Sequence, residues 1–510
     1  MSDSDSHSEM APPPRPIKRL GLGLRAILQL AFAFICLIGI CYLGYKNFTR
    51  VDLTKRKTFT LSEATQNLLL SDSMQDREIP VKLIAGVRRK SIHFARLQPL
   101  LEEYERISKG KIQIELVSPS QDANRAAEIK NNYDTLLSDK LFERELLIID
   151  ARGTSEQSGI NNLRYLPTSD LIVKRDDQNN QRKIVGFQDE ELISSMIQSA
   201  IEGTPRRLYL IADKSDVSIG EPNSPAKILS ETLERQNIFL DIIKISEIET
   251  IPADAEGVVI VAPQYDFETK EIAVLEDYWN RNSSAIIAYL DPNPRTVNLR
   301  SFLRKKGVTP RDDRIIRTRN GRTEAQVMAN FTAGLGINGS LENQAVMFEG
   351  RVSSLEVRED AQDLVSNGIR CFSIIQTASG FWGESSYREP KPKFDANSDE
   401  PGPLSLGAAV IRGNANADDT ADNVSKMIVL SSADFLDPKR LGNEQLDFIK
   451  NSTHWLLGRE ELIGVGPRSI ERRHLNLIGE EIKLLQNIII VFIPAGIFLI
   501  AIFVWNTRRA

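Results

Sequence analysis

The chain has 510 residues, of which 41% are hydrophobic and 26% are charged, and its formal net charge is −5. This length supports more than one buried core, so we expect two or three domains. The slightly acidic balance provides no global positive field, so no nucleic-acid partner is expected.

Two apolar stretches without charged residues lie near the ends, at Ala26–Tyr45 and Ile488–Trp505. Roughly 20 helical residues cross the hydrocarbon core of a bilayer. The first stretch is longer than the apolar region of a signal peptide, and no small-residue cleavage pattern follows it. The second contains Pro494, which membrane helices tolerate better than soluble helices do, although a buried core helix is the alternative there. We therefore expect transmembrane helices at residues 26–45 and 484–506.

Small residues let membrane helices approach each other closely. Gly39 and Gly44 in the first stretch and Gly496 in the second are candidates for such packing. Basic residues flank both sides of each stretch, so the positive-inside rule leaves the orientation open.

The first block after the apolar stretch alternates between strand and helix patterns. Apolar, β-branched or alternating runs predict strands at Ile79–Ala85, Lys111–Val117 and Leu146–Asp150. Helical stripes lie between them, at Ser91–Ser108 and Gln121–Tyr133. This β-α-β-α-β order predicts a sheet with helical cover, of thioredoxin-like size.

Two more strands and a helix complete the first block. The strands are predicted at Leu171–Lys174 and Lys183–Phe187, with a hairpin turn around Asp176–Asn180. Gln188–Ile201 then forms the helix that closes the domain.

The second block has strands that are almost continuously apolar, separated by amphipathic helices. The strands are Arg207–Ala212, Phe239–Ile243, Gly257–Ala262 and Ala285–Leu290, and the helices are Pro225–Gln236 and Glu268–Asn280. Such strands are typical of a doubly wound parallel sheet, of Rossmann-like or amidotransferase-like kind.

Ligands of such sheets sit beyond the carboxyl ends of the strands. Polar residues follow three predicted strands and form a candidate ligand or partner surface. They are Asp213, Ser215, Asp216, Gln264, Tyr265, Asp291 and Asn293.

The pattern weakens from about residue 300 to residue 425 and returns with a strand at Lys426–Leu430 and a helix at Asn443–Leu457. The predicted segments are a disordered tail 1–25, a transmembrane helix 26–45, a first α/β domain 46–204, a second α/β domain 205–462 with an insertion at about 300–425, a membrane-proximal connector 463–483, a transmembrane helix 484–506 and a tail 507–510.

The motifs of common catalytic and metal sites are missing from the sequence. A P-loop, an HExxH helix, a CxxC pair and a GxSxG elbow are all missing, and the four histidines are scattered. Cys371 lies in a weakly patterned segment and is interpreted as a small buried hydrophobe. The carboxylate pairs Glu190/Glu191 and Asp418/Asp419 are interpreted as solvated surface. No catalytic residue, metal or cofactor is therefore predicted.

The order of several segments carries a family resemblance. They are RVDLTKRKTFTLSEAT after the first apolar stretch, LLEEYERISKGKIQIELVSP, FQDEELISSMIQSAIEG, GVVIVAPQYDFETKEIAVLEDYWNRNSSAIIAYLDP, GPLSLGAAV, KMIVLSSADFLD and NSTHWLLGREELIGVGPRSIERRHLNL. Together they resemble the GldG-type auxiliary subunits of ABC transport systems, also called gliding-motility-associated proteins.

The resemblance implies a non-catalytic subunit that partners a permease and a P-loop ATPase in the bacterial inner membrane. Both termini are then cytoplasmic, and the body is periplasmic, where it binds a protein or polymer. Family members often show a Gly-His-Gly-Glu-like turn after the first strand of the second sheet, whereas this chain has Asp213–Glu221 there, without histidine. Two alternatives remain, a receptor for a small ligand or glycan at the second sheet and a hydrolase with an unrecognised site.

Overall fold

The computed structural model describes most of the chain between residues 60 and 469 and short parts beyond it. The described residues are 28–39, 42, 60–133, 145–153, 160–176, 182–292, 296–319, 322–324, 326–348, 351–389, 392–413, 424–460, 463, 468–469, 494–497 and 501–502. Internal contacts divide the chain into two units, Met1–Phe59 and Thr60–Ala510, and each is described by itself.

In the first unit, residues 28–39 are helical, with exposed apolar side chains such as Leu30 and Phe32. Residues 28–39 and 42 of the predicted membrane segment 26–45 are described, whereas only residues 494–497 and 501–502 of the segment 484–506 are. Within the part of the chain that the structure describes, no helix is both long and apolar enough to cross a membrane.

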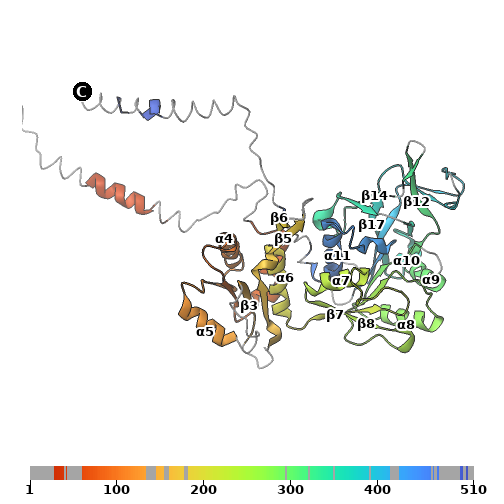
Figure 1. Ribbon diagram of the computed structural model, residues 1–510, viewed down its shortest axis with the longest axis horizontal. Coiled ribbons are helices and arrows are strands. Elements are labelled where there is room, and N and C mark those ends of the chain that lie inside the picture. Colours follow the sequence, from red (N-terminus) through yellow and green to blue (C-terminus); the bar gives the residue numbers. More distant parts are fainter. Residues whose placement is uncertain are drawn as a thin grey trace, which may run out of the picture. The chain divides into compact units, whose positions relative to one another are not determined.

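The second unit begins with a four-stranded sheet in the order β2-β1-β3-β4. Figure 1 labels its strand β3, close to α5 and α6. β1 is parallel to β2 and antiparallel to β3, and β3 is antiparallel to β4. The strands are β1 (Val81–Gly86), β2 (Ile112–Val117), β3 (Leu146–Asp150) and β4 (Leu163–Pro167). The β-α-β-α-β order predicted for this block is confirmed.

Helices cover this sheet, and the longer ones among them have an apolar stripe at helical spacing. The helices are α2 (Glu63–Leu70), α3 (Asp72–Gln75), α4 (Ile92–Ile107), α5 (Ala123–Tyr133) and α6 (Asp189–Glu202). In α4, Leu97, Leu101 and Tyr104 are buried against the sheet. Ser91 caps α4 by accepting a hydrogen bond from the His93 amide at 3.3 Å.

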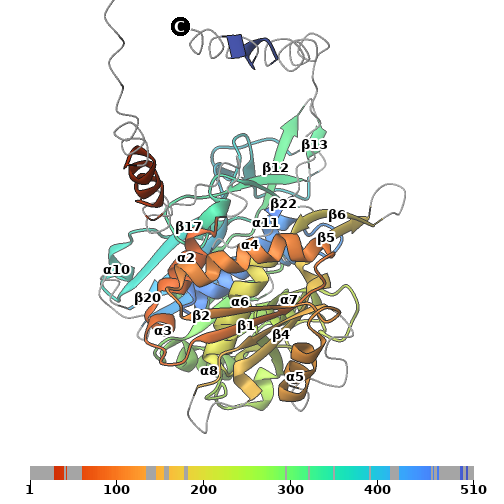
Figure 2. The ribbon, with the colours of Figure 1, turned by 90° about the vertical axis from the view of Figure 1, so that its left-hand side faces the viewer.

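A small three-stranded sheet in the order β22-β6-β5 lies beside this domain. β5 (Ile172–Asp176) and β6 (Arg182–Phe187) are antiparallel, as the sequence predicts. β22 (Arg468–Ser469) comes from the predicted connector, and it pairs antiparallel with the end of β6. Figure 2 shows β22 next to β6, close to one end of α4. This pairing of residues far apart in the chain was not predicted.

The second sheet is large, with a main path in the order β15-β14-β17-β20-β21-β10-β9-β7-β8. The five strands from β8 to β21 are all parallel, whereas from β21 to β15 each strand is antiparallel to its neighbour. The strands are β7 (Arg206–Ile211), β8 (Ile238–Ile243), β9 (Gly257–Val261), β10 (Ala285–Tyr289), β14 (Val327–Phe331), β15 (Ala345–Phe348), β17 (Ile369–Thr377), β20 (Ser405–Arg412) and β21 (Ser425–Leu430).

The prediction of a parallel sheet is therefore correct for one half only, and the sheet as a whole is mixed. The stretch at about 300–425, predicted as an insertion, supplies four antiparallel strands of this main path, and β11 (Val308–Pro310) and β16 (Leu355–Val357) pair beside β20 in the same sheet. The strands β14 and β15 alternate between buried and exposed positions, so they lack the continuous apolar runs that mark buried parallel strands, whereas β20 is buried continuously from Leu406 to Val410.

Helices cover both faces of the parallel half (Figure 1). On one face, α7 (Pro225–Glu234) and α11 (Asn443–Leu456) pack on strand residues that include Val259 and Ile428. On the other, α8 (Thr269–Trp279) and α9 (Val297–Lys305) pack on the alternate residues, including Ile260 and Val429. The two-residue period of a strand thus divides these apolar runs between two helical layers.

Shorter elements complete the second unit. They are β11 (Val308–Pro310), β12 (Arg314–Arg319), β13 (Arg322–Glu324), β16 (Leu355–Val357), β18 (Trp382–Glu384), β19 (Glu400–Pro401), α10 (Gln362–Val365) and the 3-10 turns Ile160–Asn162, Thr168–Leu171, Ile245–Glu247, Gly339–Leu341 and Ala433–Leu436.

Buried ion pairs join the two α/β parts where α6 faces α11 and the chain just beyond it; we call this junction the seam. Lys450 Nζ lies 2.6 Å from Glu191 Oε1, and the two side chains are 12% and 7% exposed. Arg459 is buried, binds the Glu202 carboxylate and donates to the Gln236 carbonyl at 3.0 Å. Ion pairs between buried side chains therefore hold the two parts together.

Candidate functional site

The parallel strands end at one edge of the large sheet, where the predicted site residues lie. β8 and β9 lie on opposite sides of β7, so the connections diverge at the carboxyl ends of β7 and β9. Such a switch point is the usual ligand position in doubly wound sheets. Here the two loops are in contact, because the amides of Gln264 and Tyr265 donate to the Lys214 carbonyl at 2.8 and 3.2 Å.

The Asp213 carboxylate is occupied by the backbone of a neighbouring turn. Its oxygens accept hydrogen bonds from the amides of Ile245 and Ser246, both at 3.0 Å. Partial burial acts to raise the pKa of Asp213, but the hydrogen bonds outweigh it and lower that pKa. Asp213 thus holds the start of a 3-10 turn in place.

Lys214 fills the space beside the switch point. Its Nζ lies 2.7 Å from Glu271 Oε2, with side chains that are 10% and 1% exposed, and 5.6 Å from the Phe267 ring centroid. The same Glu271 oxygen accepts from the Glu268 amide at 2.7 Å, as part of a capping box at the start of α8. The switch point is therefore closed by the chain's own ion pair.

The remaining predicted residues are spread along this edge. Ser215 Oγ accepts from the Val217 amide at 3.0 Å, while Asp216, Gln264 and Tyr265 have exposed side chains. Asp291 borders the hollow described next. Asn293 lies outside the described residues.

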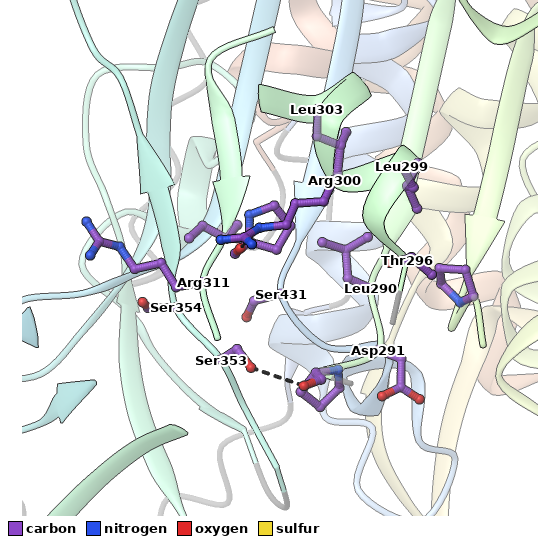
Figure 3. A pocket seen from close by; sticks show the side chains of 14 residues that line it. Leu290, Asp291, Thr296, Leu299, Arg300, Leu303, Arg311, Ser353, Ser354 and Ser431 are labelled. Atoms are coloured by element: carbon purple, nitrogen blue, oxygen red, sulfur yellow. Dashed lines mark hydrogen bonds between the residues drawn. The ribbon is translucent and has the colours of Figure 1, made fainter. Parts of the chain in front are cut away.

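A hollow opens at the carboxyl ends of β9, β10 and β21, which we call the strand-end hollow (Figure 3). One wall is made by leucines of α9, and another by the Ser353–Leu355 stretch that leads into β16. Ser431 follows β21 directly, and Figure 3 shows its side chain between Arg300, Leu290 and Ser353. The hollow is thus built by both the parallel half and the stretch at 300–425.

Most polar groups of the strand-end hollow are already bound. Arg300 Nε donates to the Pro310 carbonyl at 2.8 Å, and an Arg311 nitrogen lies 2.6 Å from a Glu400 oxygen. Ser354 Oγ donates to Asp313 Oδ2 at 2.5 Å, and Ser353 Oγ accepts from Arg314 at 2.8 Å.

Ser431 Oγ is buried and has no hydrogen-bond partner among the described residues. The cavity volume is about 30 Å³. A water molecule needs roughly 10–15 Å³ of such volume, so one or two waters fit and a glycan does not. Ser431 also has no base within hydrogen-bonding distance among the described residues, so it does not form the nucleophile–base pair that acyl transfer needs.

A larger hollow, with a volume of about 470 Å³, is lined by residues of β4, β5, α6 and the 3-10 turn Thr168–Leu171, and by Arg235 just after α7. Leu166, Ile172 and Leu192 contribute apolar surface, and Asp170 and Arg235 contribute charge. The sequence did not predict this hollow, because none of the segments that form its walls carries a sequence pattern of a binding site.

Cys371 and His454 are both buried in states that disfavour reaction. Burial raises the pKa of the Cys371 thiol to about 12, and its Sγ donates to the Lys306 carbonyl at 3.1 Å. Burial, together with the charges of Arg459 and Lys450, lowers the pKa of His454 to about 3. At neutral pH neither a thiolate nor an imidazolium is favoured at these positions.

The interpretation of Glu190 and Glu191 as solvated surface is wrong. They are only 3% and 7% exposed, at the start of α6. Glu190 Oε1 accepts from the Ser62 amide at 2.5 Å, and Glu191 binds Lys450. The pair is adjacent in sequence, but its carboxylates point to different partners. Asp418 and Asp419 lie outside the described residues.

The glycines predicted to pack membrane helices have open surroundings where they are described. A methyl group on Gly39 or Gly496 would meet no atom within 4 Å, and Gly44 lies outside the described residues. Within the described ranges, no group of three or more His, Cys, Asp and Glu side chains is placed to hold a metal ion.

Comparison with known proteins places part of the chain. A family model described as a domain of unknown function, DUF7088, matches residues 55–163. Among curated proteins there is no significant match.

Three solved structures each match about half of the chain. The mmIFT52 N-terminal domain matches 49% of this chain and 96% of its own length, with 15% identity and a TM-score of 0.33. A ThuA-like protein from Bacteroides uniformis matches 50% of this chain and 91% of its own length, with 10% identity and a TM-score of 0.28. The α-L-fucosidase isoenzyme 2 from Paenibacillus thiaminolyticus matches 52% of this chain and 37% of its own length, with 10% identity and a TM-score of 0.29. At these TM-scores the likenesses assign no activity to the chain.

Sequence reasoning missed Ser431 and Arg300 at this edge. Ser431 follows the apolar run of β21 as Asp291 follows that of β10, so the rule of looking beyond each strand applies to it as well. Arg300 lies in a stretch rich in basic residues, and nothing in the sequence distinguishes it from the other basic residues there.

Proposed function

We propose that this protein is a non-catalytic, membrane-anchored auxiliary subunit of an ABC-type transport complex, of the gliding-motility or secretion kind. Its two apolar segments cross the bacterial inner membrane, both termini are cytoplasmic, and the large body is periplasmic. The two apolar segments contact a permease that works with a P-loop ATPase, and the body binds a periplasmic protein or polymer.

The observation that carries this proposal is the order of the family-like segments between two charge-free apolar stretches. The chemistry of the body supports it. The charged groups best placed for a reaction, such as Lys214 and Glu271, are paired with each other, and Asp213 is bound by backbone amides. Charged groups paired in this way stabilise loops, so few of them remain available to act as catalytic acids, bases or nucleophiles.

We also propose that the first domain is thioredoxin-like without redox chemistry. The order β2-β1-β3-β4, with only β3 antiparallel to the other strands, supports this. A reactive dithiol at the start of a helix needs Cys-X-X-Cys, because the helix dipole lowers the thiol pKa. The stretch from β1 into α4, Val87–Ser91, contains no cysteine.

The test is purification of the full chain from native membranes in mild detergent, followed by mass spectrometry of what remains bound. A polytopic permease and a P-loop ATPase are expected to copurify. As a control for helix contacts, Gly496→Leu adds bulk where close approach of helices is proposed, and it is expected to reduce the recovered permease while the body stays folded.

Recovery of a partner-free monomer from native membranes contradicts the proposal. Labelling of the body by nucleophile-trapping probes favours the hydrolase alternative instead. Thermal stabilisation of the chain by a glycan favours the receptor alternative.

A further inference from the structure

Both chain segments that lead to the apolar stretches meet the body at the start of α6. On the N-terminal side, the Ser62 amide donates to Glu190 Oε1 at 2.5 Å. On the C-terminal side, Arg468 pairs with Phe187 in the ladder of β22 and β6. Phe187 and Glu190 are three positions apart, and such a stretch spans at most about 11 Å. The two attachment points are therefore neighbours on the surface of the body.

The loop before α4 lies at the same place. Arg96 forms an ion pair with Asp189 and stacks on Phe187, with its guanidinium carbon 3.7 Å from the ring centroid. Ile92 begins α4 one turn before Arg96, about 6 Å along the helix axis. α4 thus brings the loop Arg88–Ser91 to the residues that receive both ends of the body (Figure 2).

We call this region the anchoring corner and define it by residues 60–63, 88–92, 170–176, 182–188 and 468–469. Its sequence contains eight basic residues and three acidic ones, whereas the whole chain has a net charge of −5. The basic residues are Arg88, Arg89, Lys90, Lys174, Arg175, Arg182, Lys183 and Arg468, and the acidic residues are Glu63, Asp170 and Asp176. The charged side chains of the corner that the structure describes are Arg88, Arg89, Lys90, Glu63 and Asp170, so its described positive charge is concentrated in the loop Arg88–Ser91.

The loop of the anchoring corner combines exposed charge with an exposed aliphatic residue. Arg88 is 70% exposed and pairs with Glu145, whose side chain is mostly buried. Arg89 and Lys90 are exposed, and no ion pair to either of them is found among the described residues. Ile92 follows them and is 62% exposed. Basic side chains flanking an exposed apolar one are typical of surfaces that bind anionic membranes.

We propose that the anchoring corner lies against the anionic headgroups of the bilayer, with Arg88, Arg89 and Lys90 at the lipid phosphates and Ile92 at the interface. The proposal rests on the anchoring part of the proposed function, because it takes both apolar stretches as membrane helices. It adds which face of the body is membrane-facing and what holds that face there. A fixed face gives the rest of the body a defined height and orientation above the membrane.

The test uses the full chain in vesicles of phosphatidylcholine with or without phosphatidylglycerol. Cys36 and Cys41 are replaced by alanine, and a single fluorophore is attached at Ile92→Cys or at Val297→Cys. Val297 is a matched control, since it also begins a helix and is 67% exposed. Lipids with a headgroup-linked quencher then report which position lies at the surface.

Stronger quenching at residue 92 than at residue 297 is expected in phosphatidylglycerol vesicles, with a decrease at high salt. Each basic residue near an anionic surface changes its occupancy by about fivefold, so the combined reversal Arg88→Glu, Arg89→Glu and Lys90→Glu is expected to lower quenching at residue 92 by at least about twofold. The control reversal of Lys244, Lys270 and Lys305, all more than half exposed, is expected to leave it unchanged.

Equal quenching at residues 92 and 297, or quenching at 92 that survives the charge reversal, overturns the proposal. Extraction with alkaline carbonate separates this failure from a failure of the proposed function. A chain that carbonate extracts is not membrane-anchored, and both proposals then fail. If the chain resists extraction but residue 92 shows no preferential quenching, only the proposal about the anchoring corner is refuted.

Discussion

The seam and the anchoring corner lie at different sides of α6. They differ in whether their charged side chains are buried or exposed to solvent. At the seam, Arg459, Lys450 and their carboxylate partners are largely removed from water. At the anchoring corner, Arg88 is 70% exposed and its neighbours Arg89 and Lys90 are exposed too. Buried charges must keep their partners, whereas exposed charges remain available to a second molecule. Charge alone therefore does not mark a binding site in this protein, and burial decides its role.

The largest expected effect is at Arg459. Arg459→Ala leaves the Glu202 carboxylate without its main partner and removes a hydrogen bond to the Gln236 carbonyl. Breaking a buried pair in this way destabilises by about 3–5 kcal/mol. Urea unfolding of the full chain in detergent, followed by tryptophan fluorescence, measures the loss. If Arg459→Ala lowered the free energy of unfolding only as little as substitution of an exposed arginine does, the contrast between the seam and the corner would not hold.

Lys450→Met is expected to have a smaller effect, of about 2 kcal/mol, because Glu191 can take up a proton when the cation is gone. In the native protein burial acts to lower the pKa of Lys450, but the attraction of Glu191 and Asp447 outweighs it and raises that pKa. The same unfolding measurement applies. Adding Glu191→Leu to Lys450→Met is expected to recover part of the loss, and further destabilisation by the double variant would argue against a coupled pair.

The pH dependence of stability tests the environment of His454. Its pKa is lowered to about 3 in the folded state, mainly by burial, so the unfolded chain binds a proton at higher pH than the native chain. Stability from this group is complete above the unfolded pKa of about 6.5 and falls toward pH 3 by about 1.4 kcal/mol per pH unit.

His454→Gln is expected to make the free energy of unfolding less dependent on pH in this range, by the contribution of one titrating proton. The comparison uses unfolding free energies of both proteins between pH 5 and pH 7, expressed as their difference. Parallel profiles would show that His454 is accessible to protons in the native seam.

The smallest effect is expected at the anchoring corner. Arg88→Ala removes an ion pair to Glu145 that is mostly solvated on the arginine side, and such pairs contribute about 0–1 kcal/mol. The unfolding free energy should therefore change little, while the quenching at residue 92 described above should fall. A loss of stability comparable to that of Arg459→Ala would show that the corner is structural.

Local patterns predicted much of the core but little of the site. The apolar runs at Gly257–Val261 and Ala285–Tyr289 and the helical stripe of α4 were found where expected, because burial on a known face repeats with the period of the element. A hollow lies at the edge where the strands end, and of the predicted surface residues Asp291 borders it. The roles of Asp213 and Lys214 were not predictable, since their partners come from β8–β9 and α8.

The sequence by itself determined the two apolar stretches, the α/β character and the parallel strands, because each is a property of neighbouring residues. Tertiary structure decided that residues 300–425 extend the same sheet, that Glu190 and Glu191 are buried, and that β22 returns to β6. Glu190, Glu191 and β22 have partners more than a hundred residues away in the chain. Residues 300–425 join the parallel half through β21, where Lys426 pairs with the distant Ala285 of β10. A polar or short segment carries no local mark of its distant partner, so only the folded chain brings both ends of the body to one corner.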